Sequence, residues 1–267
     1  MNNFKDLEMK SFCVIKNFLD NNTISTILED YFLIQNEEIL YPKFSIIPAG
    51  KKKNLDFLKD TINPLIKNIS DYSLIKTNYV ANPVYFSIKH GINFPFHQDH
   101  DSWFLYGDHS NYLNVWIPII KPNYDITNLS IINLYKLLND HPELQFLENY
   151  GATEFTTGNQ SKIIDYNNDK TIELDFDLNL YAETPHLNAG DALVMRGYAI
   201  HKTQDILTDR LAISFRCVNT NTKLFKENFI SASGHKKIFF DTAPAGFLDK
   251  IKLHFETVNE CTIGDIL

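Results

Sequence analysis

The sequence predicts a mainly β protein with flanking helices. Leucine and β-branched residues alternate with other residue types over 112–119, and a similar alternation covers 210–217. A period of two is typical of β-strands. Apolar residues recur at helical spacing over 24–32, and the stretch FLDKIKLHFETVNE at 247–260 is amphipathic. Strands between two helical ends predict one domain with a β core.

Helices are expected in the N-terminal part of the chain, residues 1–73. Asp20, in DNN, is a typical helix start. The apolar positions that follow it at helical spacing are Ile24, Ile27, Leu28, Tyr31 and Phe32. A second helix is expected around residues 54–70, with a break or kink near Pro64, because proline cannot donate the helical hydrogen bond.

The β core is expected over about residues 74–218, interrupted by a long polar region at about 123–186. That region contains a strand-like start, a short helix and an exposed excursion. Such an insertion forms a lid or substrate wall in some proteins and a plain surface hairpin in others, and the pattern leaves both open. The last part, 219–267, is expected to form a helical cap on the outside of the sheet.

Composition limits the kinds of function. The chain of 267 residues has 44% hydrophobic residues and a net charge of -8. An acidic surface argues against nucleic acid as a partner. The N-terminus has no apolar signal region and no long apolar run follows, so we expect a cytoplasmic protein that does not bind membranes. Cys13, Cys217 and Cys261 are far apart, which argues against disulfides and a thiolate metal site.

Arginine is rare and clustered. Of the 25 basic residues only three are arginines, namely Arg196, Arg210 and Arg216, and all fall in one short stretch of the chain. Arginine differs from lysine by its planar fork, which can hold a carboxylate through two hydrogen bonds. The cluster therefore indicates a site for a carboxylate near Arg210 or Arg216.

The stretch FPFHQDHDSW, residues 94–103, suggests a metal site. His97 and Asp99 are two positions apart, so on an extended strand both side chains project to the same side. His201 follows an apolar strand and is the candidate third ligand. Two histidines and one carboxylate form the facial triad of non-haem Fe(II) oxygenases, which leaves metal positions open. The usual cosubstrate of that chemistry is 2-oxoglutarate, and Arg210 is placed to hold its far carboxylate.

These motifs resemble the phytanoyl-CoA dioxygenase-like group of Fe(II)/2-oxoglutarate-dependent oxygenases. The family pattern is H-x-D, then Gly-Asp before a strand, then His with Ser or Thr two residues on, then Arg. The matching positions here are His97, Asp99, Gly190, Asp191, His201, Thr203 and Arg210. The resemblance spans roughly residues 12–218, but only the two motif regions are specific. The spacing from His201 to Arg210 is slightly short, and the family's Pro-Gly-Ser-His run is missing.

The resemblance implies a double-stranded β-helix, a jelly-roll (cupin-like) core with iron at the barrel mouth. It implies Fe(II), 2-oxoglutarate and O2 as cofactor and cosubstrates. The residues expected to contact 2-oxoglutarate are Arg210, Asn114, Thr203 and Ser214, and those expected to contact substrate are Arg216, Asp101 and Trp116. Since halogenating relatives replace the carboxylate with a small residue, Asp99 implies hydroxylation or a related oxidation.

The expected function is hydroxylation of an unactivated C–H of a small metabolite, such as an amino acid or a natural-product intermediate, with release of succinate and CO2. Hydroxylation of a protein or peptide side chain is an alternative. A cupin-like metal-binding or isomerase module is another, although such sites usually carry more histidines and do not need an arginine clamp. A metal-free jelly roll is disfavoured because both His97 and Asp99 are present.

Overall fold

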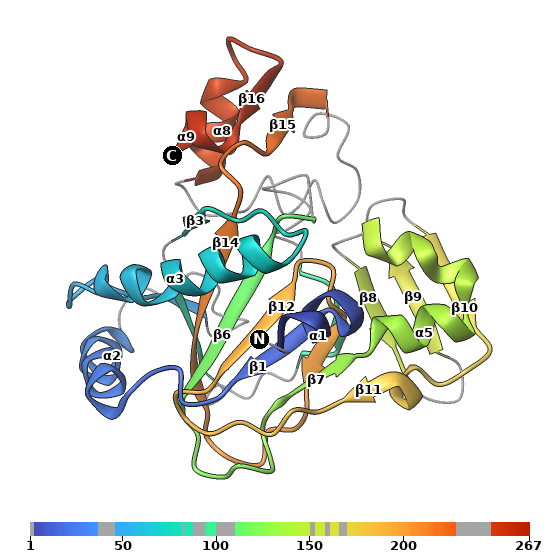
Figure 1. Ribbon diagram of the computed structural model, residues 1–267, viewed down its shortest axis with the longest axis horizontal. Helices are drawn as coiled ribbons and strands as arrows, with labels where there is room; N and C mark the ends of the chain where they lie inside the picture. Colours follow the sequence, from blue (N-terminus) through green and yellow to red (C-terminus); the bar gives the residue numbers. More distant parts are fainter. Residues whose placement is uncertain are drawn as a thin grey trace.

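The computed structural model describes residues 3–36, 46–81, 83–87, 94–99, 110–149, 153–157, 161–165, 170–227 and 247–267. Within these ranges the protein is mainly antiparallel β with flanking helices, as the sequence predicts. Two large sheets build the core, and a small third sheet lies at the C-terminal end (Figure 1).

The first sheet contains the long strands at the centre of the molecule. In spatial order its strands are β1 (Phe12–Ile15), β12 (Ala192–Arg196), β6 (Leu113–Ile120), β14 (Leu211–Val218), β4 (Val84–Ser87) and β2 (Ile46–Pro48). A short strand, β3 (Tyr79–Val80), also pairs with β14. The two predicted alternating segments, β6 and β14, are adjacent and antiparallel.

The second sheet carries residues from widely separated parts of the chain. Its strands, in order, are β10 (Lys170–Leu174), β9 (Ser161–Asp165), β8 (Thr153–Thr156), β5 (Phe96–His97), β13 (His201–Thr203), β7 (Leu129–Ile132) and β11 (Ala182–Glu183). The strands from β7 to β11 all lie in the region 123–186 that was expected to be an insertion, yet they pair within this sheet. That region therefore contributes to the core as well as to the surface.

Helical elements of the region 123–186 pack beside the second sheet. They are α5 (Leu134–Asp140) and the 3-10 segments η3 (Pro142–Asn149) and η4 (Leu178–Tyr181). Their apolar side chains share one buried cluster with Phe96 and Phe155 of the sheet.

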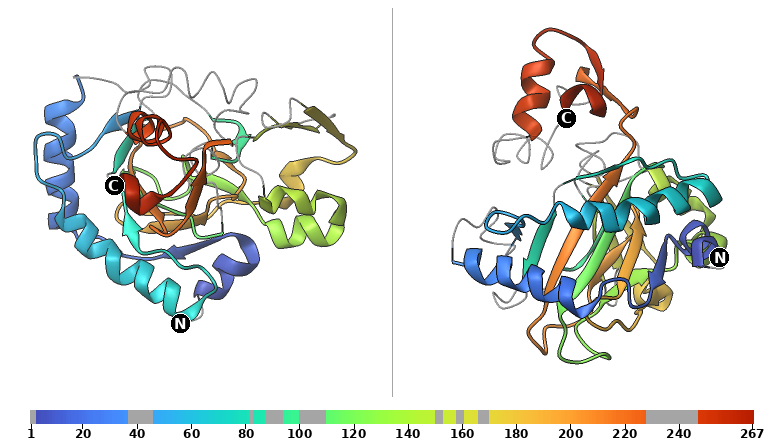
Figure 2. Two further views of the ribbon diagram at one scale, coloured as in Figure 1. Left: turned by 90° about the horizontal axis from the view of Figure 1, so that it is seen from above. Right: turned by 60° about the vertical axis from the view of Figure 1, so that its left-hand side comes forward.

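Helix packing determines which face of β6 and β14 points inward. The helices α1 (Asn3–Lys10), α2 (Asn21–Ile34) and α3 (Phe57–Tyr72) lie along the outer side of the first sheet (Figure 2). The apolar face of each strand packs in the same cluster as these helices, as Val115 and Ile213 illustrate. The opposite face, which carries Asn114, Ser214 and Arg216, therefore lies between the sheets.

The helix α2 begins where the sequence predicts. Asp20 is its N-cap, and its carboxylate accepts a hydrogen bond from the backbone N–H of Thr23 at 2.7 Å. On the predicted apolar face Ile27 and Tyr31 are buried and Ile24 and Leu28 are partly buried, but Phe32 is 52% exposed. A helix can bury only one stripe of its surface, and Phe32 lies beside that stripe.

Of the break or kink predicted near Pro64, the break is absent. The helix α3 runs from Phe57 to Tyr72 as one element with Pro64 inside it. Pro64 is exposed, whereas Ile62, Leu65 and Ile66 are buried. Because the lost hydrogen bond lies on the solvent side, water can solvate the carbonyl while the packed side remains in place.

The C-terminal part forms a small unit at one end of the molecule. Its elements are β15 (Lys223–Phe225), α8 (Phe247–His254), β16 (Glu260–Thr262) and α9 (Ile263–Ile266). Helix α8 packs against α9 beyond the end of β14 rather than across a face of the large sheets (Figures 1 and 2). The predicted amphipathic helix is present, but it does not lie on the outside of the sheet as expected.

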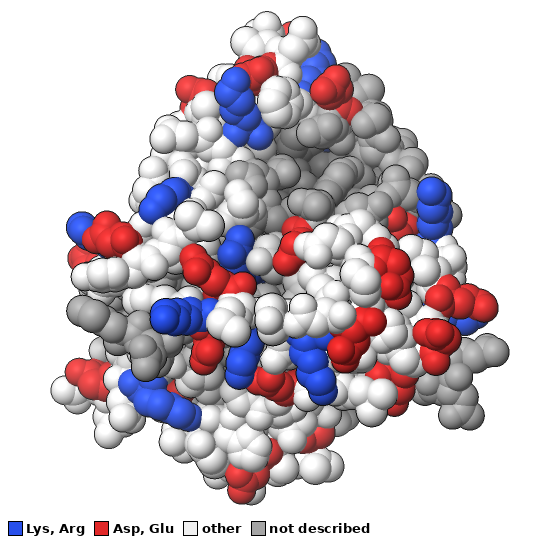
Figure 3. All heavy atoms as spheres, turned by 45° about the vertical axis from the view of Figure 1, so that its right-hand side comes forward, with Lys and Arg blue, Asp and Glu red and all other residues white. Residues whose placement is uncertain are grey.

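The described surface shows mixed charge. Acidic and basic side chains are interspersed over the face seen in Figure 3. In the described ranges, no helix combines the length and the apolar character that crossing a bilayer requires.

Candidate metal centre

His97, Asp99 and His201 lie together between the two sheets. Strands β5 and β13 are antiparallel neighbours in which His97 lies directly opposite His201. Their imidazole rings are 4.4 Å apart, and Asp99 Oδ1 lies 3.8 Å from the Nε2 atom of each. One potential ligand atom from each residue falls within 4.8 Å of the others. The structure thus brings the three predicted ligands into one cluster.

The contacts of Gln98 explain why its two neighbours, His97 and Asp99, project to the same side. Its amide group points the opposite way and donates hydrogen bonds to the carbonyl oxygens of Leu147 at 2.7 Å and Tyr198 at 2.9 Å. Gln98 is fully buried. Since side chains alternate along an extended chain, anchoring Gln98 on one side directs His97 and Asp99 to the other.

Both histidines have their Nε2 lone pairs free for a metal. His97 Nδ1 lies 2.8 Å from the carbonyl oxygen of Pro95, and His201 Nδ1 lies 2.9 Å from that of Ala199. A carbonyl oxygen only accepts, so each Nδ1 carries the proton and each Nε2 presents a lone pair to the centre. This arrangement of outer hydrogen bonds is typical of metal-binding histidines.

The protonation states also suit a metal. Burial would raise the pKa of Asp99, but the charges of His201, Arg216 and His97 and the hydrogen bond from Asn114 hold that pKa at about 2. Burial, together with the charge of His97, lowers the pKa of His201 to about 4. A carboxylate beside a neutral imidazole is the form that binds a divalent cation.

Asn114, Ser214 and Arg216 form a chain of hydrogen bonds that ends on Asp99. Asn114 Nδ2 donates to Asp99 Oδ2 at 3.0 Å, and Ser214 Oγ donates to Asn114 Oδ1 at 2.6 Å. Arg216 donates to Ser214 Oγ at 2.7 Å. The sequence predicted Asn114 and Ser214 as cosubstrate contacts and Arg216 as a substrate contact, and the structure joins all three to the carboxylate ligand.

Arg210 lies elsewhere in the same interior. Its guanidinium is stacked over Trp116, 5.0 Å from the ring centre, and donates to the carbonyl oxygens of Thr127 at 3.0 Å and Asn128 at 3.2 Å. The side chain is buried, and its Nε atom has no hydrogen-bond partner. Burial, opposed by the charge of Asp205, lowers the pKa of Arg210 to about 10. The hydrogen bonds that Arg210 makes with described residues go to neutral carbonyl oxygens, and a buried cation of this kind is stabilised when an anion binds beside it.

Lys121 is a second cation near Arg210 that the sequence analysis missed. Its ammonium group donates to the carbonyl oxygens of Asn123 and Ile126. Burial and the positive charge of Arg210 lower the pKa of Lys121 to about 8. The place of Lys121 directly after an apolar strand was the available signal, but one lysine among many carries no pattern.

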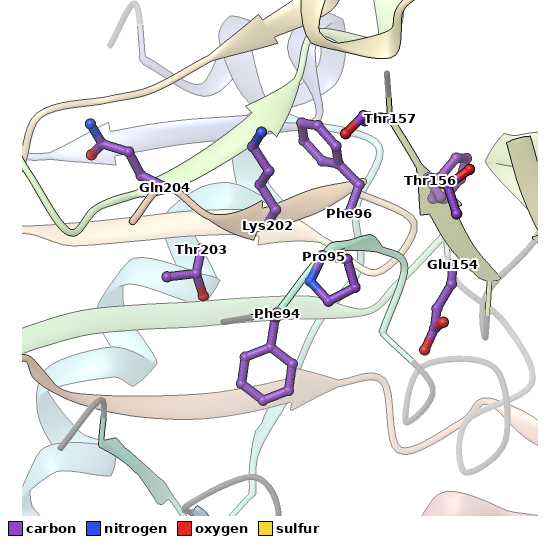
Figure 4. Close-up of a pocket in the computed structure, with 10 residues that line it drawn as sticks. Phe94, Pro95, Phe96, Glu154, Thr156, Thr157, Lys202, Thr203 and Gln204 are labelled. Atoms are coloured by element: carbon purple, nitrogen blue, oxygen red, sulfur yellow. The ribbon is translucent and has the colours of Figure 1, made fainter. Parts of the chain in front are cut away.

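A pocket of about 280 Å³ is lined by neighbours of His97 and His201, although neither histidine nor Asp99 lines it. The Phe94 ring lies 5.6 Å from the His97 ring, and Glu154 is the strand partner of His97 in β8. Thr203, two residues after His201, is also part of the wall. Phe94, Glu154 and Thr203 point to one side of the strands, away from Lys202 (Figure 4). The full lining is Phe94, Pro95, Phe96, Glu154, Phe155, Thr156, Thr157, Lys202, Thr203 and Gln204.

Glu154 could not be found from sequence, because its place opposite His97 depends on strand pairing. The predicted substrate residue Asp101 lies outside the described residues. Arg196, the third arginine, donates to the carbonyl oxygen of Ser110 at 3.3 Å and stacks over Tyr198, in keeping with a structural role.

The Gly190-Asp191 motif has a structural function. Gly190 has a φ of +83°, and a Cβ atom there would lie 2.7 Å from the carbonyl oxygen of Leu19. Asp191 is buried and accepts hydrogen bonds from the backbone of Asn17 at 2.8 Å and from Lys16 at 3.0 Å. The motif therefore ties the N-terminal segment to the start of β12, the strand that precedes His201 in the chain.

Comparison with known proteins supports the fold. No protein-family model and no curated protein sequence matches the chain. Among solved structures, the non-heme alpha ketoglutarate dependent carbocyclase SnoK of nogalamycin biosynthesis matches with a TM-score of 0.54 and 11% identity, covering 82% of this chain and 83% of that one. The epimerase SnoN of the same biosynthesis matches with a TM-score of 0.52 and 12% identity, covering 82% and 81%.

A third solved structure, HygX from Streptomyces hygroscopicus with nickel, 2-oxoglutarate and hygromycin B bound, matches with a TM-score of 0.52 and 10% identity, covering 82% of this chain and 86% of that one. At these identities the likeness concerns the fold, which is the predicted jelly roll. Fold and site together define a jelly-roll protein with two histidines and one carboxylate placed to hold a metal ion.

Proposed function

We propose that this protein is an Fe(II)- and 2-oxoglutarate-dependent oxygenase that acts on a small molecule. The observation that carries the proposal is the cluster of His97, Asp99 and His201, whose ligand atoms lie within 4.8 Å of one another. Two neutral imidazole nitrogens and one carboxylate are the donor set of non-haem Fe(II) oxygenases. The matching folds of 2-oxoglutarate-dependent enzymes support the same class.

In this proposal the interior of the barrel holds both the metal and the cosubstrate. When bound, Fe(II) with 2-oxoglutarate and O2 supplies the oxidising power, and the protein supplies position and exclusion of water. Arg210 holds the far carboxylate of 2-oxoglutarate through its planar fork. Trp116, which stacks on Arg210, and Thr203, two residues after His201 in β13, are proposed to contact the bound molecules between Arg210 and the metal ligands.

Hydroxylation is the proposed reaction. Asp99 occupies the position that halogenating relatives leave empty, which favours oxygen transfer. The solved structures with this fold include an epimerase and a carbocyclase, so the same centre supports other oxidations. The assignment to the phytanoyl-CoA dioxygenase-like group rests on the motif residues, as does the proposed hydroxylase activity.

The proposed substrate binds in the pocket lined by neighbours of His97 and His201. Its volume of about 280 Å³ suits a small molecule or one end of a larger one. The walls combine aromatic rings, threonines and the carboxylate of Glu154. HygX was solved with a small molecule, hygromycin B, which supports a small-molecule substrate over a protein side chain.

Anaerobic binding tests this function. The apoprotein is titrated with Fe(II) and then with 2-oxoglutarate, and the visible charge-transfer band of the chelate is recorded. We expect Arg210→Met to weaken 2-oxoglutarate binding by about 10- to 100-fold, the loss of about 1.5–3 kcal/mol typical of a hydrogen bond to a charged group. Arg196→Met is the matched control, and its affinity should equal that of the wild type.

Each other outcome has a separate meaning. Iron binding without any 2-oxoglutarate band would favour the cupin-like metal-binding module. Absence of iron binding by the wild type would contradict the metal site and the oxygenase proposal together.

A further inference from the structure

We infer that Asn114, Ser214 and Arg216 are positioning residues that hold Asp99 as a one-oxygen ligand and so keep a metal position open for the cosubstrate. The inference rests on the proposed function, because it concerns how the same centre is prepared. It differs from a contact role, since none of the three residues needs to touch substrate or 2-oxoglutarate.

The two oxygens of Asp99 have different surroundings. Oδ1 lies 3.8 Å from the Nε2 atoms of both His97 and His201. Oδ2 accepts the hydrogen bond from Asn114 Nδ2 at 3.0 Å. A metal placed among the three ligands therefore meets Oδ1, while Asn114 occupies Oδ2.

Arg216 and Asp99, at the two ends of this series of hydrogen bonds, determine which group donates in each bond. A guanidinium only donates hydrogen bonds and a carboxylate only accepts them. Ser214 Oγ accepts from Arg216 at 2.7 Å, so its own proton goes to Asn114 Oδ1 at 2.6 Å. Asn114 must then present its NH2 group to Asp99. Arg216 also donates to Asn114 Oδ1 at 3.5 Å, so Ser214 and Arg216 together hold the amide group in this orientation.

The fold makes this chain rigid. Asn114 and Arg216 lie opposite each other on β6 and β14, so their side chains share the inner face. Asn114 is 5% exposed and Ser214 is 1% exposed. Arg216 also lies over the Phe86 ring at 5.8 Å. Both strands belong to the first sheet, whereas both histidines belong to the second. The hydrogen bonds from these residues therefore hold Asp99 from across the space between the sheets.

Coordination chemistry shows the consequence. Two histidines and a one-oxygen carboxylate use three of the six positions of an octahedral ion and leave three. A carboxylate that swung to bind through both oxygens would use a fourth position, so a keto acid bound through two atoms would leave no position for O2. The hydrogen bond from Asn114 opposes that swing.

The test compares matched variants in the full chain loaded with Co(II), whose visible d–d bands change with coordination number. Ser214→Val and Ser214→Thr add the same volume, but only threonine keeps the hydroxyl. We expect Ser214→Val and Asn114→Leu to lower Co(II) affinity by about 10- to 100-fold and to alter the d–d spectrum, both without and with 2-oxoglutarate. Ser214→Thr and Arg216→Lys should retain the wild-type spectrum.

A control separates positioning from general stability. Ser130→Val removes another buried strand hydroxyl, which lies 2.6 Å from that of Thr184, and its Co(II) spectrum should match the wild type even if its melting temperature falls. Wild-type spectra and affinities in Ser214→Val and Asn114→Leu would overturn the inference and leave the proposed function intact. Failure of the wild type to bind Co(II) and Fe(II) would overturn both.

Discussion

At the scale of single residues, the direction of lone pairs matters as much as residue type. His97 and His201 each use Nδ1 for a backbone carbonyl two residues earlier, so both Nε2 atoms meet at the same point. The same local hydrogen bond, repeated on two strands, orients two ligands without any further side chain. Such preorganisation reduces the rearrangement that metal binding requires.

The two neighbouring cations Arg210 and Lys121 lead to a prediction about the pH dependence of 2-oxoglutarate binding. Burial and Arg210 lower the pKa of Lys121 to about 8, so Lys121 is a cation at pH 7 and loses its charge as the pH rises through that value. We expect 2-oxoglutarate binding to weaken between about pH 7 and pH 9, because an anion beside Arg210 loses one of two attracting charges. Isothermal titration over this range measures the effect.

Lys121→Met supplies the control for that prediction. This variant should bind 2-oxoglutarate more weakly at pH 7 and should show little change up to pH 9. If 2-oxoglutarate binding by the variant depended on pH as it does in the wild type, the titrating group would be one other than Lys121.

At the scale of elements, a strand of only two residues carries one of the metal ligands. The strand β5 consists of Phe96 and His97 and pairs with both β8 and β13. Pairing on both sides, with Gln98 anchored next to it, gives this short strand a defined place. Alternation along the chain then accounts for the direction of His97 and Asp99.

A buried carboxylate on α2 organises a nearby turn and leads to a stability prediction. Asp30 is fully buried and accepts hydrogen bonds from Tyr85 Oη at 2.9 Å and from the backbone N–H groups of Gly50 at 2.8 Å, Lys52 at 3.0 Å and Lys53 at 2.9 Å. We expect Asp30→Ala to reduce the free energy of unfolding by roughly 2–4 kcal/mol, because the buried Tyr85 hydroxyl and three backbone N–H groups lose a charged acceptor. Denaturant unfolding measures this.

Its neighbour Glu29 is a suitable control. Glu29 forms an ion pair with Lys53 at 3.0 Å, but its side chain is 62% exposed. Glu29→Ala should change the free energy of unfolding by less than about 1 kcal/mol. Equal losses in both variants would contradict the role assigned to Asp30.

At the scale of the whole molecule, the helices on one side of the first sheet decide what the barrel interior contains. The apolar faces of β6 and β14 pack against these helices. The interior then receives the remaining faces, with Trp116 and Ala212 in an apolar cluster and Asn114 and Ser214 near the metal ligands. The packing of the helices on one face of this sheet therefore places two things in the interior. These are the proposed cosubstrate region and the hydrogen-bonded residues Asn114 and Ser214 beside Asp99.

The packing also predicts how the cysteines react. Cys13, Cys217 and Cys261 are all free and buried. Burial raises the pKa of Cys13 and of Cys217 to about 12, and it raises the pKa of Cys261 as well. We expect none of the three thiols to react promptly with a disulfide reagent at pH 8, because the thiolate is the reactive form.

Guanidinium-denatured protein should react at all three positions, which provides the reference. Prompt reaction of one thiol in the folded protein would show that the part of the structure covering it opens locally. Single Cys→Ser variants would identify the residue.

Much of the site could be predicted because its signals are local. The i, i+2 spacing of His97 and Asp99 is a property of any extended chain, and the cap of α2 at Asp20 depends on neighbouring backbone groups. The fold class followed from the alternation in β6 and β14. The exposure of Phe32 and the unbroken helix at Pro64 could not be predicted in this way, because burial of a helix face depends on what packs against it.

The sequence by itself determined the strand faces, the helix starts and the residue types that can hold a metal. Only the tertiary structure decided that His201 faces His97, that Glu154 lies on the other side of His97, and that the chain from Arg216 ends on Asp99. Strand pairing and the packing of helices on one sheet join positions far apart in the chain. The free energy of these contacts comes from burial and hydrogen bonding between distant segments, which no local pattern records.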